Sequence, residues 1–318
     1  MPGDRRNRRR PRRDGTSPLQ LVAIASVLLG LVLISLRLLP GSPLESIAAA
    51  RWGDVPDTTS RGGEATSTDR SSRPTPSPSP SPDPLPFDLT STSIDVEIDG
   101  WYGWSVMDTR SGEIIGSKNM DETSTTASLI KAWIVADYLR RADEAGDKPG
   151  DGKLNDATLI IRDSDNLRTE RLYTEVGRAA SIKRMIKICE MTDSSVADDK
   201  GWSRTNLSPR DTTRLGQCIA DGRAAGPEWT DWLLKEMRLV RGSGDFGIRK
   251  AFSAKVGKTI AIKNGWVDRI DEQEIHVNCL AIGEDWTMGV MLRYPINRGY
   301  EYGMDNCEKV TDTLLRRP

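Results

Sequence analysis

The sequence predicts an α+β fold for residues 93–318: an antiparallel sheet formed by N- and C-terminal strands, with a helical lobe inserted between them, arranged as an α/β/α sandwich. Three observations predict this class. Apolar and polar residues alternate after Ile94, helical periodicity dominates the middle of the segment, and two strand-like runs, 277–283 and 286–294, lie near its end. Strands at both ends with helices between them imply that the first and last strands pair in one sheet.

The elements are expected in the following order. Residues 94–119 alternate around the turn residues 109–112, which is typical of a β-hairpin. Residues 128–142 carry a wide apolar face, as in a largely buried helix. Helical periodicity returns in three later segments and again at the chain end: 168–190, 209–223, 228–240 and 304–316.

The N-terminal segment predicts a membrane anchor. Residues 1–14 hold seven Arg and two Asp, and the eighteen residues from Leu19 to Leu36 are uncharged. As a helix this run would be about 27 Å long, close to the thickness of a bilayer core. A basic flank keeps the N-terminus in the cytoplasm. We therefore expect a basic cytoplasmic tail (1–18) and a signal-anchor helix (19–39) that contacts membrane lipid, with the folded domain outside the cell membrane.

Of two alternatives to this interpretation, one is set aside and one remains open. The arginine run alone would suit nucleic acid, but the apolar span that follows it favours a membrane flank, so no nucleic-acid partner is expected. A cleaved signal peptide is the other alternative, because the run Ala48 to Ala50 resembles a cleavage site. The domain is exported in either case.

Residues 40–92 are predicted to be a disordered linker rich in Ser, Thr and Pro. Pro alternates with Ser, Thr or Asp from Pro74 to Pro84, which favours an extended rod without a core. A ligand for a proline-binding module is the competing interpretation. We expect a stalk that holds the domain away from the bilayer.

Three short motifs occur in an informative order. Ser128 and Lys131 lie three residues apart at the start of the buried helix, where a desolvated lysine amine can activate a serine hydroxyl. Ser164-Asp165-Asn166 follows a helical stretch, and Lys263-Asn264-Gly265 follows a strand-like run. Each motif alone is weak, and their order in these settings is the specific signal.

With these motifs, about 220 residues resemble the serine β-lactamase and penicillin-binding-protein superfamily, most closely the class A-like serine hydrolases. The resemblance implies that Ser128 is acylated, that Lys131 is its base, that Ser164 relays a proton and that Lys263 binds the substrate carboxylate. It assigns substrate binding to Asn166, Asn264, Gly265 and Trp266, with the backbone N–H groups of Ser128 and Trp266 forming an oxyanion hole.

Three departures from the family pattern stand out. The 36 residues from Ser128 to Ser164 are fewer than in typical class A penicillinases, so part of the helical lobe should be trimmed. Asn264 stands where Ser or Thr is usual. The position of the water-activating glutamate corresponds to Trp202, and no glutamate occurs between Glu190 and Glu228.

The cysteines and the single histidine point away from metal chemistry, and no metal or cofactor is expected. His276 lies before an apolar run and is interpreted as a strand residue. The four cysteines lack Cys-x-x-Cys spacing and are exported, which favours disulfides. Of three possible pairings, we prefer 189 with 218 and 279 with 307, because the predicted elements that hold each pair are neighbours.

The expected function is that of an exported, membrane-anchored acyl-serine hydrolase or penicillin-interacting protein. The resemblance implies D-alanyl-D-alanine-like cell-wall peptides or β-lactams as its small-molecule partners. The alternative is a catalytically weak or inactive scaffold or binding domain at the cell wall, because Asn264 and Trp202 depart from the pattern.

Overall fold

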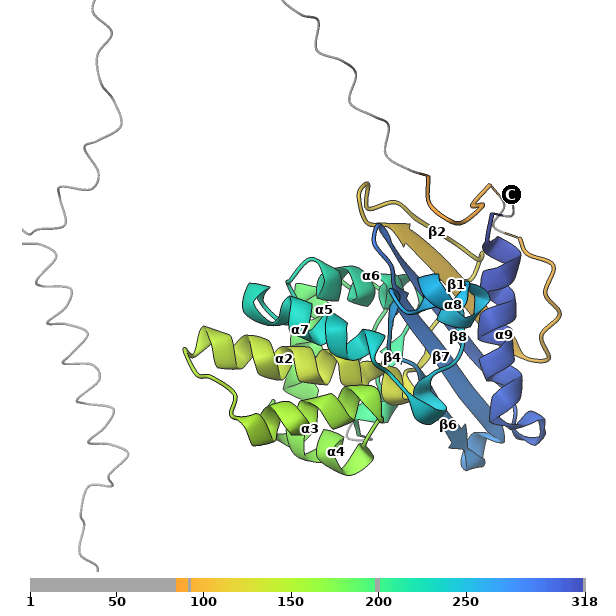
Figure 1. The fold of residues 1–318 in the computed structure, drawn as a ribbon. Coiled ribbons are helices and arrows are strands. Elements are labelled where there is room, and N and C mark those ends of the chain that lie inside the picture. Colours follow the sequence, from red (N-terminus) through yellow and green to blue (C-terminus); the bar gives the residue numbers. More distant parts are fainter. Residues whose placement is uncertain (1–83, 91–92, 198–200, 317–318) are drawn as a thin grey trace, which may run out of the picture. The chain divides into compact units, whose positions relative to one another are not determined.

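The computed structural model describes residues 84–90, 93–197 and 201–316 (Figure 1). The predicted tail, the membrane span at 19–39 and most of the predicted linker lie outside these residues. Within the described ranges, no helix combines the length and apolar character needed to cross a bilayer.

An antiparallel sheet forms the centre of the domain, in the order β2-β1-β8-β7-β5, and β6 also pairs with β7. β1 pairs with β8 along its whole length, from Trp101 opposite Arg293 to Asp108 opposite Trp286. The predicted pairing of the first and last strands is therefore confirmed. The strands are β1 (Trp101–Asp108), β2 (Ile114–Gly116), β5 (Ala261–Ile262), β6 (Gly265–Arg269), β7 (Glu274–Ile282) and β8 (Trp286–Pro295).

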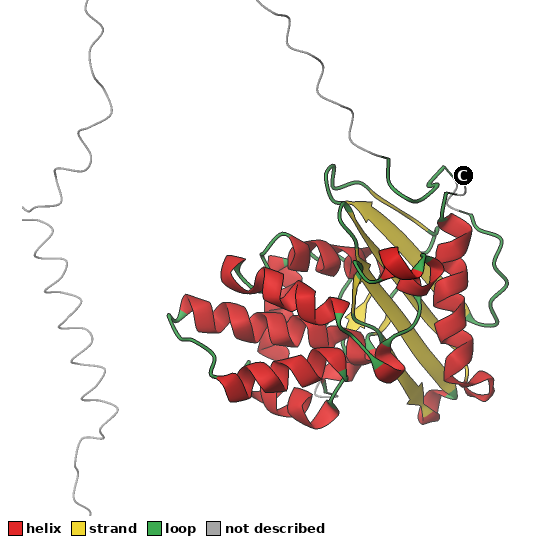
Figure 2. Ribbon diagram, in the orientation of Figure 1, coloured by secondary structure: helices red, strands yellow, loops and turns green. Residues whose placement is uncertain are grey.

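Helices cover both faces of this sheet (Figure 2). Alternate side chains of β8 show the two layers, because successive residues of a strand point to opposite faces. Thr287 donates to the carbonyl of Thr213 in α6 (Pro209–Ala220), while Tyr294 receives the N–H of Gly303 in α9 (Gly299–Leu314). The α/β/α arrangement predicted from the sequence is confirmed.

The helical lobe lies between β2 and β5 in the chain. A 3₁₀ turn (Ala127–Ile130) leads into α2, and a short two-stranded pair accompanies it: β3 (Ser124–Thr125) with β4 (Asn206–Leu207). The remaining lobe helices are α2 (Lys131–Glu144), α3 (Asp151–Arg162), α4 (Asn166–Glu175), α5 (Ala179–Ile188) and α7 (Pro227–Arg238), and the short α8 (Ala254–Gly257) follows them.

Two predicted helix boundaries were wrong. The segment 168–190 is two helices, because Gly177 and Arg178 both take positive φ angles, 89° and 53°, which no α-helix accommodates. The final helix begins at Gly299 instead of residue 304, directly after β8 and a short 3₁₀ turn.

The predicted linker boundary at residue 92 also needs correction. Phe87 is 1% exposed and its ring packs edge-on against Trp286 with centroids 4.9 Å apart. It forms an isolated bridge with Leu315, so residues 84–90 lie along the end of α9. The buried Phe87 ring and the backbone hydrogen bonds to Leu314 and Arg316 together fix this segment on the domain.

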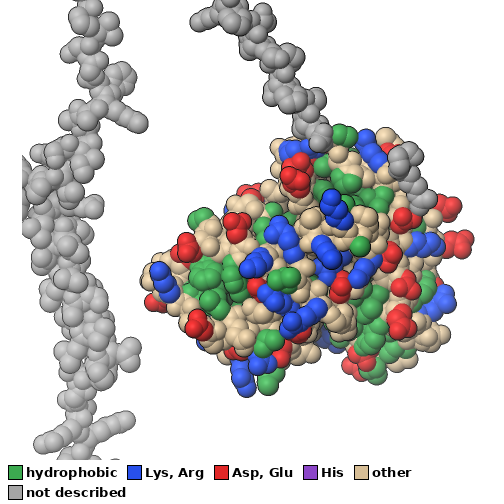
Figure 3. Space-filling model, viewed as in Figure 1, with side chains coloured by type: hydrophobic (Ala, Val, Ile, Leu, Met, Phe, Trp, Pro, Cys, Tyr) green, Lys and Arg blue, Asp and Glu red, His purple; other side chains and the backbone are tan. Residues whose placement is uncertain are grey.

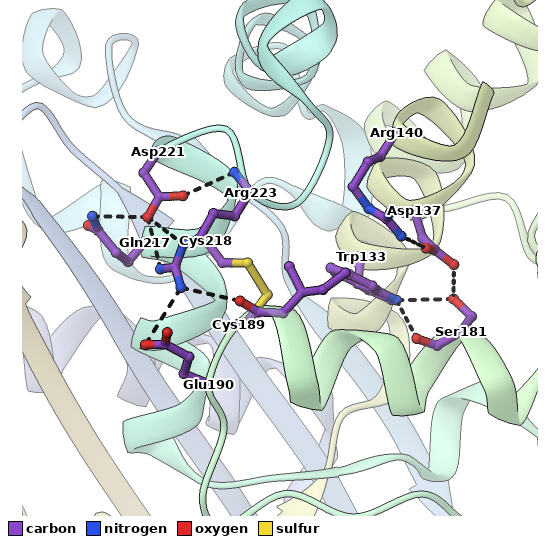
Figure 4. Close-up of a disulfide and its surroundings, with 11 residues drawn as sticks. Trp133, Asp137, Arg140, Ser181, Cys189, Glu190, Gln217, Cys218, Asp221 and Arg223 are labelled. Carbon is purple, nitrogen blue, oxygen red and sulfur yellow. Dashed lines mark hydrogen bonds and ion pairs between the residues drawn. A yellow bond between two sulfur atoms is a disulfide. The ribbon is translucent and has the colours of Figure 1, made fainter. Parts of the chain in front are cut away.

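Both preferred disulfides are present. Cys189 bonds to Cys218, which joins the residue after α5 to α6 (Figure 4), and Cys279 of β7 bonds to Cys307 of α9. Figure 4 also shows a buried polar network to the right of the first disulfide, in which Asp137 of α2 accepts from Arg140 and from Ser181.

Candidate active site

The nucleophile candidate Ser128 lies in the 3₁₀ turn that precedes α2, and it is 9% exposed. Ala127 before it has φ 48°, a strained conformation for a residue with a Cβ. In a 3₁₀ turn, side chains three residues apart stack above one another. The turn therefore places Ser128 and Lys131 on one side of the helix start, as the motif requires.

Lys131 is fully buried and its ammonium is held by the second motif. Its Nζ donates to the carbonyl of Ser164 at 2.5 Å, to Ser164 Oγ at 3.2 Å and to Asn166 Oδ1 at 2.6 Å. An ammonium has three N–H bonds, and these acceptors use all of them. Loss of one proton would leave a lone pair on Nζ, which is the chemical requirement for the base that the resemblance assigns to Lys131.

Ser164 lies between the two lysines of the site. Its Oγ also accepts from Lys263 Nζ at 3.0 Å, and Lys263 is fully buried. Ser164 takes φ 59° in the loop between α3 and α4, and Asp165 then caps α4 by accepting from the amide of Arg168. The tight turn and the cap together point the Ser164 hydroxyl at both ammonium groups.

Burial lowers the pKa of both lysines. The pKa of Lys131 is lowered to about 7 by desolvation, against the opposing effect of the nearby Asp165 carboxylate. Desolvation and the charge of Lys131 lower the pKa of Lys263 well below its ordinary value. Lys131 can therefore serve as a base near neutral pH.

This pKa predicts a pH profile for acylation. Because the Lys131 amine loses its proton as pH rises through about 7, labelling by a fluorescent penicillin should be slow near pH 6 and reach a plateau above pH 8. Asp165→Asn keeps a helix-capping side chain and removes the charge that raises the Lys131 pKa, so its midpoint should move to lower pH. A rate independent of pH in both proteins would argue against Lys131 as the base.

β6 lies directly against the nucleophile turn at Gly265. A Cβ on this residue would lie 2.6 Å from Ser128 N and 2.4 Å from the carbonyl of Thr126, so only glycine fits without displacing the turn. Trp266 follows it, and its ring packs edge-on against Phe246. The close contact between β6 and the turn therefore requires glycine at position 265.

Asn264, at the middle position of the third motif, bonds to a neighbouring loop. Its Nδ2 donates to the carbonyls of Gly244 at 3.1 Å and Phe246 at 2.8 Å, and the side chain is buried. The amide therefore fixes the loop after α7. In this arrangement its N–H groups are used for structure, and a substrate carboxylate would need other donors.

Trp202 lies over the lysine, which the sequence alone did not indicate. Lys131 Nζ is 4.8 Å from the centroid of its ring, and the indole Nε1 donates to Glu170 Oε2 at 3.1 Å. An indole can donate a hydrogen bond but cannot accept a proton. Lys131 therefore faces an aromatic ring at Trp202, the position at which the sequence comparison with the family led us to look for a glutamate.

His276 is a buried strand residue, as predicted, and it groups with Glu272 and Glu274. The ligand-type atoms of the three lie within 4.8 Å of one another. Glu272 already pairs with Arg204 at 2.8 Å, and burial together with the nearby charge of Arg269 lowers the pKa of His276. The guanidinium groups of Arg204 and Arg269 thus supply positive charge beside these three side chains. We therefore assign no metal to the cluster.

No protein-family model matches the chain, and no curated protein sequence matches it. Solved structures do. The TLA-1 extended-spectrum β-lactamase aligns with a TM-score of 0.58 and 14% identity, over 69% of this chain and 94% of that one. The class A β-lactamase of Mycobacterium abscessus gives 0.54 and 17%, over 68% and 92%.

The domain has a β-lactamase fold. PBP-A aligns as well, with a TM-score of 0.53 and 19% identity over 69% of this chain and 90% of that one. At this level of identity the likeness concerns the fold. Within the β-lactamase fold, Lys131 and Lys263 both donate to Ser164 Oγ, although they are separated by 132 positions in the chain, and Ser128 lies three residues before Lys131 at the start of the same helix.

Proposed function

We propose that the domain is a serine acyl-enzyme that acts on D-alanyl-D-alanine-like peptides or binds β-lactams as their mimics. The observation that carries the proposal is the Lys131 amine, which is buried, held by Ser164 and Asn166, and one turn from Ser128. A lysine with a pKa lowered to about 7 has no evident structural benefit, whereas a serine nucleophile needs such a base.

The proposed acylation proceeds as follows. Neutral Lys131 takes the proton of Ser128 as Oγ attacks the substrate carbonyl, and the backbone N–H groups of Ser128 and Trp266 stabilise the oxyanion. The acyl C–N bond then breaks, and Ser164 passes a proton from Lys131 to the departing nitrogen. Lys263, which is desolvated and donates to Ser164 Oγ, lies where it can bind the anionic substrate group.

Hydrolysis of the acyl-enzyme is expected to be slow. Trp202 covers Lys131 and offers no proton acceptor, so no group at this position activates water. Intact-protein mass spectrometry after incubation with a fluorescent penicillin should show a persistent adduct on the peptide that contains Ser128. Rapid turnover without a trapped adduct would mean that another group activates water.

A binding or scaffold domain is the second candidate, and the arrangement of Asn264 favours it. The amide N–H groups of this residue are bonded to the loop at Gly244 and Phe246, so the side chain offers a substrate neither a hydroxyl nor a free N–H. A protein that is folded by circular dichroism and shows no mass shift with several β-lactams would support this candidate and reject the enzyme.

We further propose that the domain is displayed outside the cell membrane on the N-terminal anchor. The two disulfides support an oxidising compartment. Protease added to intact cells should release the domain. A reporter fused after Pro318 should lie outside the membrane, so a reporter that works only in the cytoplasm should show no activity. A reporter that is active only in the cytoplasm would contradict this topology.

A further inference from the structure

A strongly basic surface begins at the candidate active site and continues over α7 and α8. From residue 232 to 267 the chain has eight Lys and Arg but only two acidic residues, although the whole protein has 45 basic and 46 acidic residues. We define the basic surface by its six exposed cations: Lys235, Arg238, Arg241, Lys250, Lys255 and Lys258. Figure 3 shows Lys and Arg gathered over these two helices.

The two carboxylates within this stretch are already neutralised. Glu236 is buried and pairs with Arg162 at 2.6 Å. Asp245 pairs with the buried Arg249 at 2.6 Å and with Lys250 at 3.0 Å. Within the described residues, Lys235, Lys255 and Lys258 have no ion-pair partner. Glu228 and Asp231 are exposed earlier on α7, but among the described residues neither forms an ion pair with these lysines, so the three ammonium groups are not neutralised by direct contact.

Three of these cations converge on one cavity. A pocket of ≈ 330 Å³ is lined by Arg238, Lys250 and Lys258, together with Phe252 and Asp245. Arg238 uses its Nε for the carbonyl of Thr259, which leaves its two terminal nitrogens toward solvent. A tetrahedral phosphoryl group offers acceptors in several directions and suits three converging cations, whereas a carboxylate offers two acceptors in one plane.

The basic surface is continuous with the active site. Arg241 pairs with Asp163, the residue before Ser164, at 2.7 Å. The loop after Arg241 bonds to Asn264 through Gly244 and Phe246. A chain that lies on α7 and α8 would therefore reach the site at the Asp163 to Ser164 turn.

We propose that this basic surface binds a phosphate-bearing polymer and holds it beside Ser128. Long, exposed lysines without fixed partners suit a repeating anion better than a small ligand of fixed shape. The charge extends well past the pocket, which also indicates a polymer. The proposal goes beyond acyl transfer and does not depend on it, because binding can be measured without acylation.

The test uses the full-length protein in neutral detergent micelles with long-chain inorganic polyphosphate as the probe. Polyphosphate should bind, and equal concentrations of orthophosphate should not compete. The triple variant Lys235→Glu, Lys255→Glu, Lys258→Glu should bind on the order of tenfold more weakly, with a smaller salt dependence because fewer counterions are released. None of these lysines belongs to the catalytic group, so penicillin labelling and circular dichroism should remain as in the wild type.

A matched control changes three exposed lysines elsewhere: Lys118→Glu, Lys183→Glu and Lys187→Glu. It alters the net charge equally and should keep polyphosphate binding. Equal loss in both variants would show that only net charge matters and would overturn the proposal. Equal binding of polyglutamate would contradict a phosphate site, and displacement of polyphosphate by phosphatidylglycerol micelles at equal phosphate concentration would make the surface a membrane contact.

Discussion

Replacing Lys131 with Ala should slow acylation of Ser128 by a β-lactam at least about a hundredfold, the lower end of what a positioned general base contributes. The buried amine is bonded to Ser164 and Asn166 and has its pKa lowered to about 7, so it is the proton acceptor that the geometry provides. The rate of adduct formation by mass spectrometry measures the effect.

Two further variants separate chemistry from folding. Lys131→Met keeps the volume of the side chain and removes the base, so it should be as slow as Lys131→Ala while circular dichroism stays unchanged. Lys258→Ala removes an exposed lysine away from Ser128 and should label at the wild-type rate. A normal rate in folded Lys131→Met would show that another group takes the Ser128 proton.

Asp137→Ala should lower the free energy of unfolding by about 3–5 kcal/mol, the usual cost of removing one partner of a buried ion pair. Asp137 is fully buried and accepts from Arg140 at 2.5 Å, from Arg184 at 2.5 Å and from Ser181 at 2.6 Å. Ser181 in turn accepts from the buried Trp133 Nε1 (Figure 4). Removal of this carboxylate leaves two guanidinium groups without their shared partner inside the lobe.

Urea unfolding of the variant and the wild type measures the loss. Asp156→Ala is the matched control, because Asp156 also pairs with an arginine, Arg168 at 2.8 Å, but both side chains are more than one-third exposed. That change should cost less than about 1 kcal/mol. Similar losses in the two variants would mean that the burial of Asp137 does not determine its contribution.

The sequence by itself determined the fold class, the strand pairing and both disulfides. Alternation before and within the first hairpin and the continuous apolar runs of β7 and β8 are local signals, and they identify strands before any contact is known. The order of the three motifs also pointed to Lys131, Ser164 and Lys263, whose side chains share hydrogen bonds at Ser164 Oγ, while the catalytic roles of these residues and of Ser128 stay predictions. Local periodicity could not show the helix break at Gly177 and Arg178, because the break results from the positive φ angles of these two residues.

Only the tertiary structure decided what surrounds the lysine and the third motif. Trp202 lies over Lys131, and Asn264 bonds to the loop at Gly244 and Phe246, because segments distant in the chain meet there. The same holds for the basic surface, whose charge is visible in the sequence, while its shared pocket and its contact with the Ser164 turn are not. The physical reason is that desolvation, close packing and charge convergence depend on three-dimensional neighbours, which the residue order does not specify.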